Sequence, residues 1–205
     1  GHYSLFENKS WHDFVYTDFV NWGKNEHSTL LITPPRSLIP FLKNPKSVEL
    51  EEKIPPIFPA GLGVLATQLT RTDPSYDPWI VNLSKTDRKT FDYFVSSINH
   101  AQVKNLGISL TANYAELMNT VALLNLLSPR IQRGELRVVI GGSLISQSIK
   151  ELIPYLEKFI KMGVVLMEGP GDVDNRFARV LKGERESIRG ITYAKDGNIV
   201  RTPWR

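Results

Sequence analysis

The sequence has 205 residues, of which 41% are hydrophobic and 22% are charged, a balance typical of one or two globular domains rather than a disordered or fibrous chain. A single domain of this length buries enough surface to fold without a disulfide or a structural metal. The chain contains no Cys, which excludes a disulfide framework, a zinc ribbon, a thiol nucleophile and a cysteine-ligated iron–sulfur cluster within these residues.

The charge is mildly basic, with 25 Lys and Arg against 21 Asp and Glu. The sequence lacks the runs of Lys and Arg with interleaved aromatic residues that are typical of a nucleic-acid surface. Arg176, Arg179 and Lys182 recur at helical spacing, which predicts one solvated helix face. No apolar stretch reaches the roughly 18 residues of a membrane span, and the N-terminal residues lack the pattern of a signal peptide. We therefore expect no nucleic-acid partner, no membrane span and a cytoplasmic location.

An aromatic helix is the first element that the sequence predicts. Trp11, Phe14, Phe19 and Trp22 share one helical face after Ser10, which begins a Ser-x-x-Asp pattern typical of a capping box. We expect this helix to pack on the rest of the domain rather than to bind a cofactor.

Five short apolar runs predict strands that are buried on both faces of a parallel sheet. They are Thr29–Thr33, Trp79–Leu83, Leu106–Leu110, Leu136–Ile140 and Val164–Met167. Helical patterns separate them, at residues 59–69, 91–98, 114–124, 149–160 and 173–181. In the first, Gly61 and Gly63 are expected to permit close packing, and the last has Asp172 as its predicted N-cap and Gly183 beyond its end. This alternation predicts a doubly wound open α/β sheet.

A β-hairpin is predicted near the end of the chain. Residues 191–193 and 199–201 flank Asp196-Gly197, a pair that favours a tight hairpin turn. We expect it to form an edge or lid element.

Four loops are the candidate ligand site, because ligands of open α/β sheets bind beyond the carboxyl ends of the strands. Small and hydroxyl-bearing residues dominate these loops, and they let a bulky ligand approach the backbone. A plain turn explains any one of them equally well, but four together favour a ligand site. The loops are Thr33-Pro34-Pro35-Arg36, Ser109-Leu110-Thr111-Ala112-Asn113, Gly141-Gly142-Ser143 and Glu168-Gly169-Pro170-Gly171-Asp172.

Motifs for other chemistry are absent from the sequence. Neither a Walker-type phosphate loop nor a G-x-G-x-x-G fingerprint after the first strand occurs, and no Ser lies in a G-x-S-x-G elbow. The His residues, at positions 2, 12, 27 and 100, have no metal-ligand spacing. The sequence therefore predicts no catalytic and no metal-ligating side chains.

Several segments, in their order and spacing, resemble a known family. They are Pro55-Pro56 with the helix through Leu69, Leu106–Thr111, Val138–Ser143, Glu168–Asp172, Ile188–Tyr193, Asp196-Gly197 and Val200–Pro203. Together they resemble the N-terminal cobalamin-binding domain of cobalamin-dependent radical SAM enzymes, from about residue 28 to the end. The aromatic helix lies outside the resemblance.

The resemblance implies a flavodoxin-like, Rossmann-type α/β fold with five parallel strands in the order 2-1-3-4-5. Residues 1–27 would be an N-terminal helical extension, 28–187 the cobalamin-binding domain, and 188–205 a hairpin and the start of a linker. The dimethylbenzimidazole tail of the cofactor would lie between the loops after strands three and four. The implied cofactor-binding residues are Thr33, Pro34, Pro35, Arg36, Ser109, Leu110, Thr111, Asn113, Gly141, Gly142, Ser143, Glu168, Gly169, Pro170 and Gly171.

The loop after the first strand departs from the wider cobalamin-binding pattern. Many such proteins carry D-x-H-x-x-G there, with the histidine on cobalt, but residues 33–38 here contain no His. We therefore expect cobalamin to bind with its tail displaced and without a histidine ligand. Water or a side chain from residues 36–41 would cover the lower face of cobalt.

In the family, a radical SAM barrel follows, whose cysteines bind the [4Fe-4S] cluster that cleaves S-adenosylmethionine. Because this chain has no Cys, we expect it to be the cofactor-binding part of a longer enzyme, without activity of its own. The parent would methylate an unreactive carbon of a small molecule, with methylcobalamin as donor and the barrel as partner.

Three alternatives stay open. The chain could be a free-standing relative of that domain, or a degenerate scaffold that binds no cofactor. It could also be a flavin- or nucleotide-binding module, although Pro34-Pro35 offers no backbone N–H to a phosphate.

Overall fold

The structure, a computed structural model, describes residues 2–5, 16–36, 59–86, 88–111 and 113–205. The predicted capping box at Ser10 and the first aromatic residues of the N-terminal helix lie outside these ranges. The described part of that helix, α2, spans Tyr16–Gly23. Within the described ranges, no helix is both long enough and apolar enough to cross a membrane.

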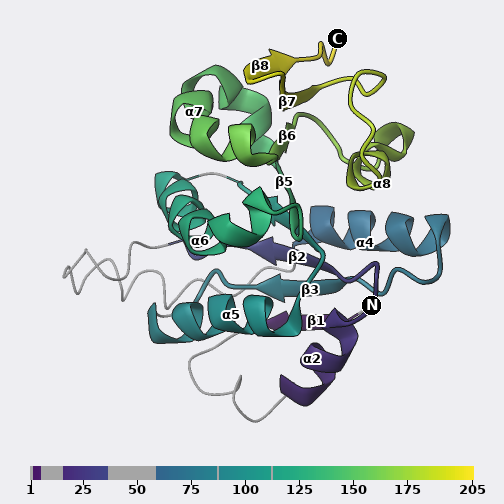
Figure 1. Ribbon diagram of the computed structural model, residues 1–205, viewed down its shortest axis with the longest axis vertical. Coiled ribbons are helices and arrows are strands. Elements are labelled where there is room, and N and C mark those ends of the chain that lie inside the picture. Colours follow the sequence, from purple (N-terminus) through teal and green to yellow (C-terminus); the bar gives the residue numbers. More distant parts are fainter. Residues whose placement is uncertain (1, 6–15, 37–58, 87, 112) are drawn as a thin grey trace.

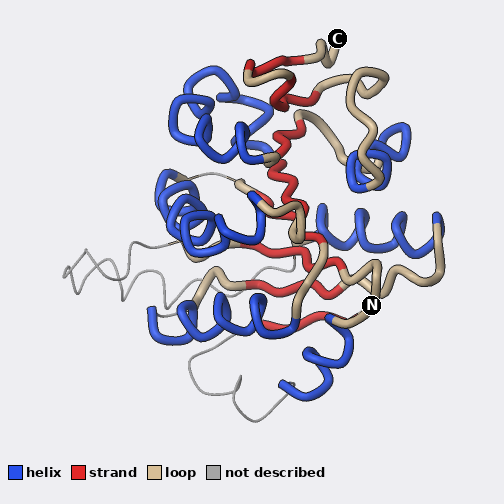
Figure 2. Tube along the Cα trace, in the orientation of Figure 1, coloured by secondary structure: helices blue, strands red, loops and turns tan. Residues whose placement is uncertain are grey.

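Strands run through the middle of the molecule and helices cover them on both sides (Figure 2). The strands are β1 (His2–Leu5), β2 (Thr29–Thr33), β3 (Trp79–Asn82), β4 (Asn105–Ser109), β5 (Arg137–Gly141), β6 (Val165–Met167), β7 (Ile191–Lys195) and β8 (Asn198–Arg201). The helices after α2 are α4 (Ala60–Thr72), α5 (Arg88–Ala101), α6 (Tyr114–Gln132), α7 (Ser143–Met162), the 3-10 turn η1 (Val173–Asn175) and α8 (Arg176–Leu181).

The strands form one sheet in the order β1-β3-β2-β4-β5-β6-β7-β8. The strands predicted from apolar runs are β2 to β6. They are parallel and their order is 2-1-3-4-5, as predicted.

The predicted extent of five strands is wrong, because the sheet has eight. β1 adds a parallel edge strand beside β3, and its four residues carry no apolar run that would predict a strand. The hairpin is not separate from the sheet, since β7 pairs antiparallel with β6. Ile191 and Tyr193 of β7 are buried in the same core as Met167 of β6, which explains why the hairpin continues the sheet.

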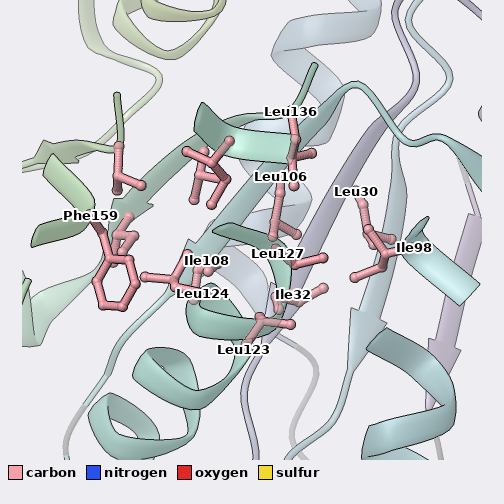
Figure 3. Packing of buried hydrophobic residues seen from close by; sticks show 14 of the residues in the cluster. Leu30, Ile32, Ile98, Leu106, Ile108, Leu123, Leu124, Leu127, Leu136 and Phe159 are labelled. Atoms are coloured by element: carbon pink, nitrogen blue, oxygen red, sulfur yellow. The ribbon is translucent and has the colours of Figure 1, made fainter. Parts of the chain in front are cut away.

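Alternate residues of the strands supply two cores, one on each face of the sheet. Leu30 and Ile32 of β2 pack with the helices α5, α6 and α7, whereas Leu31 between them packs with α4 and α8. Figure 1 shows these two groups of helices on opposite sides of the strands. Figure 3 shows the first core, where strand residues such as Leu106 meet Leu127 of α6. Burial on both faces is why the strand sequences are almost continuously apolar.

The hairpin turn forms as predicted. Asp196 and Gly197 have φ values of 52° and 78°, the positive values that both central residues of a type I′ turn require.

The helix predicted for residues 173–181 differs in its first turn. Asp174 and Asn175 have φ values of 56° and 58°, so the α-helix begins only at Arg176, and the side chain of Asp172 makes no capping hydrogen bond. The left-handed residues reorient the chain, and the side chain of Arg176 is fully buried. The prediction of one solvated face through Arg176, Arg179 and Lys182 is therefore wrong for Arg176.

Candidate functional site

A hollow of about 350 Å³ lies at the carboxyl ends of β4, β5 and β6 and extends over the sheet to Gly107 and Val139, and α4 closes its outer side. We call it the α4 hollow. The strand order reverses between β2 and β4, so the hollow lies beside the switch point where open α/β sheets bind ligands. Its lining residues are Gly61, Leu62, Val64, Leu65, Gly107, Ile108, Ser109, Val139, Gly141, Gly142, Met167, Gly169, Pro170, Gly171, Asp172 and Phe177.

Glycines make room for this hollow. A Cβ atom at Gly61 would meet no atom within 4 Å, so Gly61 faces open space. The expectation that Gly61 permits close helix packing is therefore wrong. At Gly107, in the middle of β4, a Cβ atom would lie 3.1 Å from the Phe177 ring, which packs directly over this strand. The missing side chains leave a slot between α4 and the sheet.

The walls of the α4 hollow are mainly apolar, and Ser109 and Asp172 are the polar side chains among its lining residues. The Ser109 hydroxyl is half-buried and has no hydrogen-bond partner among the described residues. Such a site fits a flat apolar group that carries a hydrogen-bonding atom.

A second hollow, of about 600 Å³, lies on the α7 side of the loop after β6. We call it the α7 hollow. Its lining is more polar, and consists of Gly142, Ser143, Ser146, Gln147, Glu168, Gly169, Pro170, Trp204 and Arg205. Gly169 and Pro170 line both hollows, so the loop Glu168–Gly171 is their common wall.

The structure brings eight of the predicted site residues to these two hollows. Ser109, Gly141, Gly142, Gly169, Pro170 and Gly171 line the α4 hollow, and Gly142, Ser143, Glu168, Gly169 and Pro170 line the α7 hollow. The others line neither: Thr33, Pro34, Pro35, Arg36, Leu110, Thr111 and Asn113.

Thr111 and Ser143 hold two loops together. The Thr111 hydroxyl donates to Oε1 of the buried Glu116 at 2.9 Å, and its backbone N–H donates to Oε2 at 3.2 Å. The Ser143 hydroxyl donates to the Thr111 carbonyl oxygen at 2.5 Å. These polar groups are thus satisfied within the protein.

Asn113 has a similar structural role. Its Oδ1 accepts from the Glu116 N–H at 2.9 Å and caps α6, while its Nδ2 donates to the Arg36 carbonyl oxygen at 3.1 Å. Asn119 of α6 donates to the Pro35 carbonyl oxygen at 2.8 Å. The described part of the loop after β2 is therefore attached to α6, away from the α4 hollow.

At Gly142 the loop after β5 lies close against the loop after β4. The φ of Gly142 is 103°, and a Cβ atom there would lie 2.3 Å from the Leu110 carbonyl oxygen. That oxygen accepts from the Leu144 N–H at 3.0 Å, and the Leu110 N–H donates to the Gly141 carbonyl oxygen at 2.9 Å. Only glycine fits between these bonds.

Glu168 uses its carboxylate inside the protein. Arg201 of β8 donates to it from Nε at 3.0 Å and from Nη2 at 2.7 Å, a bidentate pair. Hydrogen bonding to Glu168 raises the pKa of Arg201. The pair ties the loop after β6 to the hairpin.

The described histidines lie at the opposite edge of the sheet. His27 packs against the Tyr76 ring at 4.7 Å just before β2 begins, and His100 lies near the end of α5, which leads into β4. His2 begins β1, and His12 lies outside the described residues. Among the described residues, no group of three or more His, Cys, Asp or Glu side chains could hold a metal ion.

Sequence reasoning missed the α4 wall of the hollow and Phe177 of α8. The paired glycines at 61 and 63 in a helical pattern were the available signal, but only tertiary structure shows which way Gly61 faces.

Comparison with known proteins gives matches at the level of structure. No family model and no curated protein matches the sequence. The cobalamin-dependent S-adenosylmethionine radical enzyme OxsB, with aqua-cobalamin bound, superposes with a TM-score of 0.60 at 16% identity, over 88% of this chain and 23% of that one. The radical S-adenosylmethionine methyltransferase TsrM from Kitasatospora setae, with cobalamin and a [4Fe-4S] cluster bound, superposes with a TM-score of 0.55 at 19% identity, over 86% of this chain and 29% of that one.

At these identities the comparison establishes the fold, and the chain spans less than a third of either enzyme. The resemblance seen in the sequence is thereby confirmed in three dimensions. This chain has the fold of a region found in cobalamin-dependent radical S-adenosylmethionine enzymes.

Proposed function

We propose that this domain binds cobalamin at the carboxyl edge of its sheet, with the dimethylbenzimidazole tail in the α4 hollow. The observation that carries the proposal is this glycine-lined, mainly apolar hollow at the switch point of a fold shared with cobalamin-bound enzymes. Its volume of about 350 Å³ suits a fused aromatic ring, not the whole cofactor, so the corrin would lie outside the sheet edge.

The residues of the hollow fit such a tail. Leu62, Leu65 and Phe177 offer apolar contacts to the ring faces, and the free Ser109 hydroxyl can donate to a ring nitrogen. The open space at Gly61 admits the ring beside α4. The loop Glu168–Gly171 would face the corrin amides or the nucleotide part of the tail.

We further propose that cobalt has no histidine ligand. The loop after β2 contains no His, and the described histidines lie near the amino ends of the strands. Water or a side chain from residues 36–41 would cover the lower face, and of these residues only Arg36 is described.

The complete protein, in this proposal, is a radical SAM methyltransferase that methylates an unreactive carbon of a small molecule. When bound, cobalamin supplies a cobalt–carbon bond from which a methyl group is transferred. A barrel with a [4Fe-4S] cluster and S-adenosylmethionine would be the partner of the carboxyl edge. The structural likeness to TsrM and OxsB supports this part of the proposal.

Titration with hydroxocobalamin, with flavin mononucleotide in parallel, tests the binding proposal. We expect hydroxocobalamin to bind with a changed absorbance spectrum. At a hundredfold excess over Kd it should add about 2.7 kcal/mol of stability, which raises the melting temperature by roughly 5–11 °C. Flavin mononucleotide should do neither.

An increase in melting temperature with flavin mononucleotide alone would show that the domain is a flavin-binding module instead. If neither ligand changes the absorbance or the melting temperature, the cofactor-free scaffold is the better reading.

A further inference from the structure

Arg176 is a buried cation at the first position of α8. Its side chain is fully buried, although arginine is rarely buried without a partner. Burial, with a smaller contribution from Arg189, lowers the pKa of Arg176 to about 10, so it remains charged at neutral pH. Burying this charge costs free energy, so its contacts require an explanation.

The guanidinium group of Arg176 binds backbone carbonyls and forms no salt bridge with a described residue. Nη2 donates to the carbonyl oxygens of Glu168 at 2.5 Å and Pro170 at 2.8 Å, and Nη1 donates to the Arg189 carbonyl oxygen at 2.9 Å. One planar group thus fixes two points of the loop after β6 and joins them to the segment before β7.

Trp204 covers the same group. Its ring centre lies 4.3 Å from the Arg176 guanidinium carbon and 4.6 Å from that of Arg189, both cation–π distances. The ring also lies on two glycines with φ of 70°, because Cβ atoms at Gly169 and Gly190 would approach it to 2.6 and 2.8 Å. The Gly190 N–H donates to the Pro203 carbonyl oxygen at 3.1 Å, which holds this end of the chain in place.

Other contacts hold the first two residues of the loop Glu168–Gly171. The Glu168 N–H donates to the Gly190 carbonyl oxygen at 2.8 Å, the Gly169 N–H donates to the Ser146 hydroxyl at 2.8 Å, and Arg201 binds the Glu168 carboxylate. Gly169-Pro170-Gly171 has neither a polar side chain nor a large one, yet Gly169 and Pro170 form the wall between the α4 and α7 hollows. A ligand site needs its wall placed within about 0.5 Å. Two hydrogen bonds from Arg176 to the carbonyl oxygens of Glu168 and Pro170, together with the indole ring over Gly169, add to that precision.

We propose that Arg176 and Trp204 form a clamp that positions the loop Glu168–Gly171 for cofactor binding. They are positioning residues, and the proposal rests on the proposed function. Arg176 acts through the loop backbone, and Trp204 acts by covering Arg176 and Gly169.

The variants Arg176→Lys, Arg176→Met and Trp204→Leu test the clamp, with Arg179→Met as the matched control. Arg179 lies on the same helix but binds Glu184 and Ser187 instead of the loop. We expect the two Arg176 variants and Trp204→Leu to weaken hydroxocobalamin binding about tenfold at a temperature where each is folded, equivalent to about 1.4 kcal/mol. Arg176→Lys should not rescue binding, because an ammonium cannot make three bonds with the geometry of a guanidinium.

Hydrogen exchange of the cofactor-free proteins gives an independent readout. We expect the amides of residues 168–173 to exchange at least tenfold faster in the clamp variants, while those of β4 and β5 keep their rates. Trp204→Leu keeps the test valid if the Arg176 variants do not fold, since Trp204 is only half-buried.

The two readouts separate the possible failures. Unchanged exchange at residues 168–173, or unchanged Kd with only a lower melting temperature, would overturn the clamp. If wild-type protein binds no hydroxocobalamin, the proposed function fails, whereas the exchange result still decides whether the clamp orders the loop.

Discussion

Replacing Gly61 with leucine is expected to abolish cobalamin binding and leave the protein at least as stable as the wild type. Gly61 lies in α4 and faces open space in the α4 hollow, so the new side chain enters the volume assigned to the tail. Leucine is a better helix former than glycine by up to about 0.7 kcal/mol, which raises the melting temperature by roughly 2 °C. We expect at least about a hundredfold loss of hydroxocobalamin affinity, or about 2.7 kcal/mol.

Thr67→Leu is the matched control for this variant. Thr67 is exposed on the same helix and does not line the hollow, so its replacement should leave the affinity unchanged. Absorbance titration and thermal unfolding of both variants make the comparison. Wild-type affinity in Gly61→Leu would show that the tail lies elsewhere.

Gly142→Ala should be the most destabilising small substitution at the site. Its φ of 103° and ψ of 172° belong to a region that is essentially restricted to glycine, at a cost of roughly 1–3 kcal/mol for other residues. The new methyl group would also lie 2.3 Å from the Leu110 carbonyl oxygen and 2.8 Å from its nitrogen, so the backbone must move. We expect a loss of about 3 kcal/mol or more, a fall in melting temperature of roughly 6–12 °C, and weaker cofactor binding.

Gly134→Ala separates the two causes of this loss. Gly134 also has a positive φ, 70°, but a Cβ atom there would meet nothing within 4 Å. Its replacement should cost only the backbone strain, roughly 1–2 kcal/mol, in denaturant unfolding. Equal losses in the two variants would mean that the loops after β4 and β5 do not meet as closely as described.

Local patterns were sufficient to predict most of the fold. The apolar runs of β2 to β6 can be recognised in the sequence because both faces of a parallel sheet are buried. The hairpin turn can be recognised from Asp196-Gly197 because few residue pairs accept two positive φ values. β1 carried no such signal, since its pairing with β3 is set by tertiary contact.

Arg176 shows where local patterns fail. Helical spacing placed it with Arg179 on a solvated face, but the left-handed residues Asp174 and Asn175 break the helix just before it. Nothing in the spacing of charged residues reveals that turn, nor the carbonyl groups that accept from the buried guanidinium group.

The edge of the sheet that carries the candidate site could be predicted from the sequence, but the contacts of its individual side chains could not. Three of the four predicted loops contribute residues to the hollows, among them the glycines at 141, 142 and 169, whereas the described part of the loop after β2 lines neither hollow. Thr111 and Asn113 carry the same polar groups that a ligand would need, yet they bond to Glu116 and Arg36. Whether a hydroxyl or amide binds a ligand or another group of the protein depends on the residues that the fold brings beside it. The composition of a loop does not show these neighbours.

The electron paramagnetic resonance spectrum of the complex with cob(II)alamin tests the central claim most directly. Free cob(II)alamin near neutral pH shows a threefold splitting from the coordinated nitrogen of its own tail. With the tail in the α4 hollow and no histidine on cobalt, the splitting should disappear on binding. A bound complex that keeps the threefold splitting would contradict the account, because a nitrogen from the tail or from a histidine would still be on the metal.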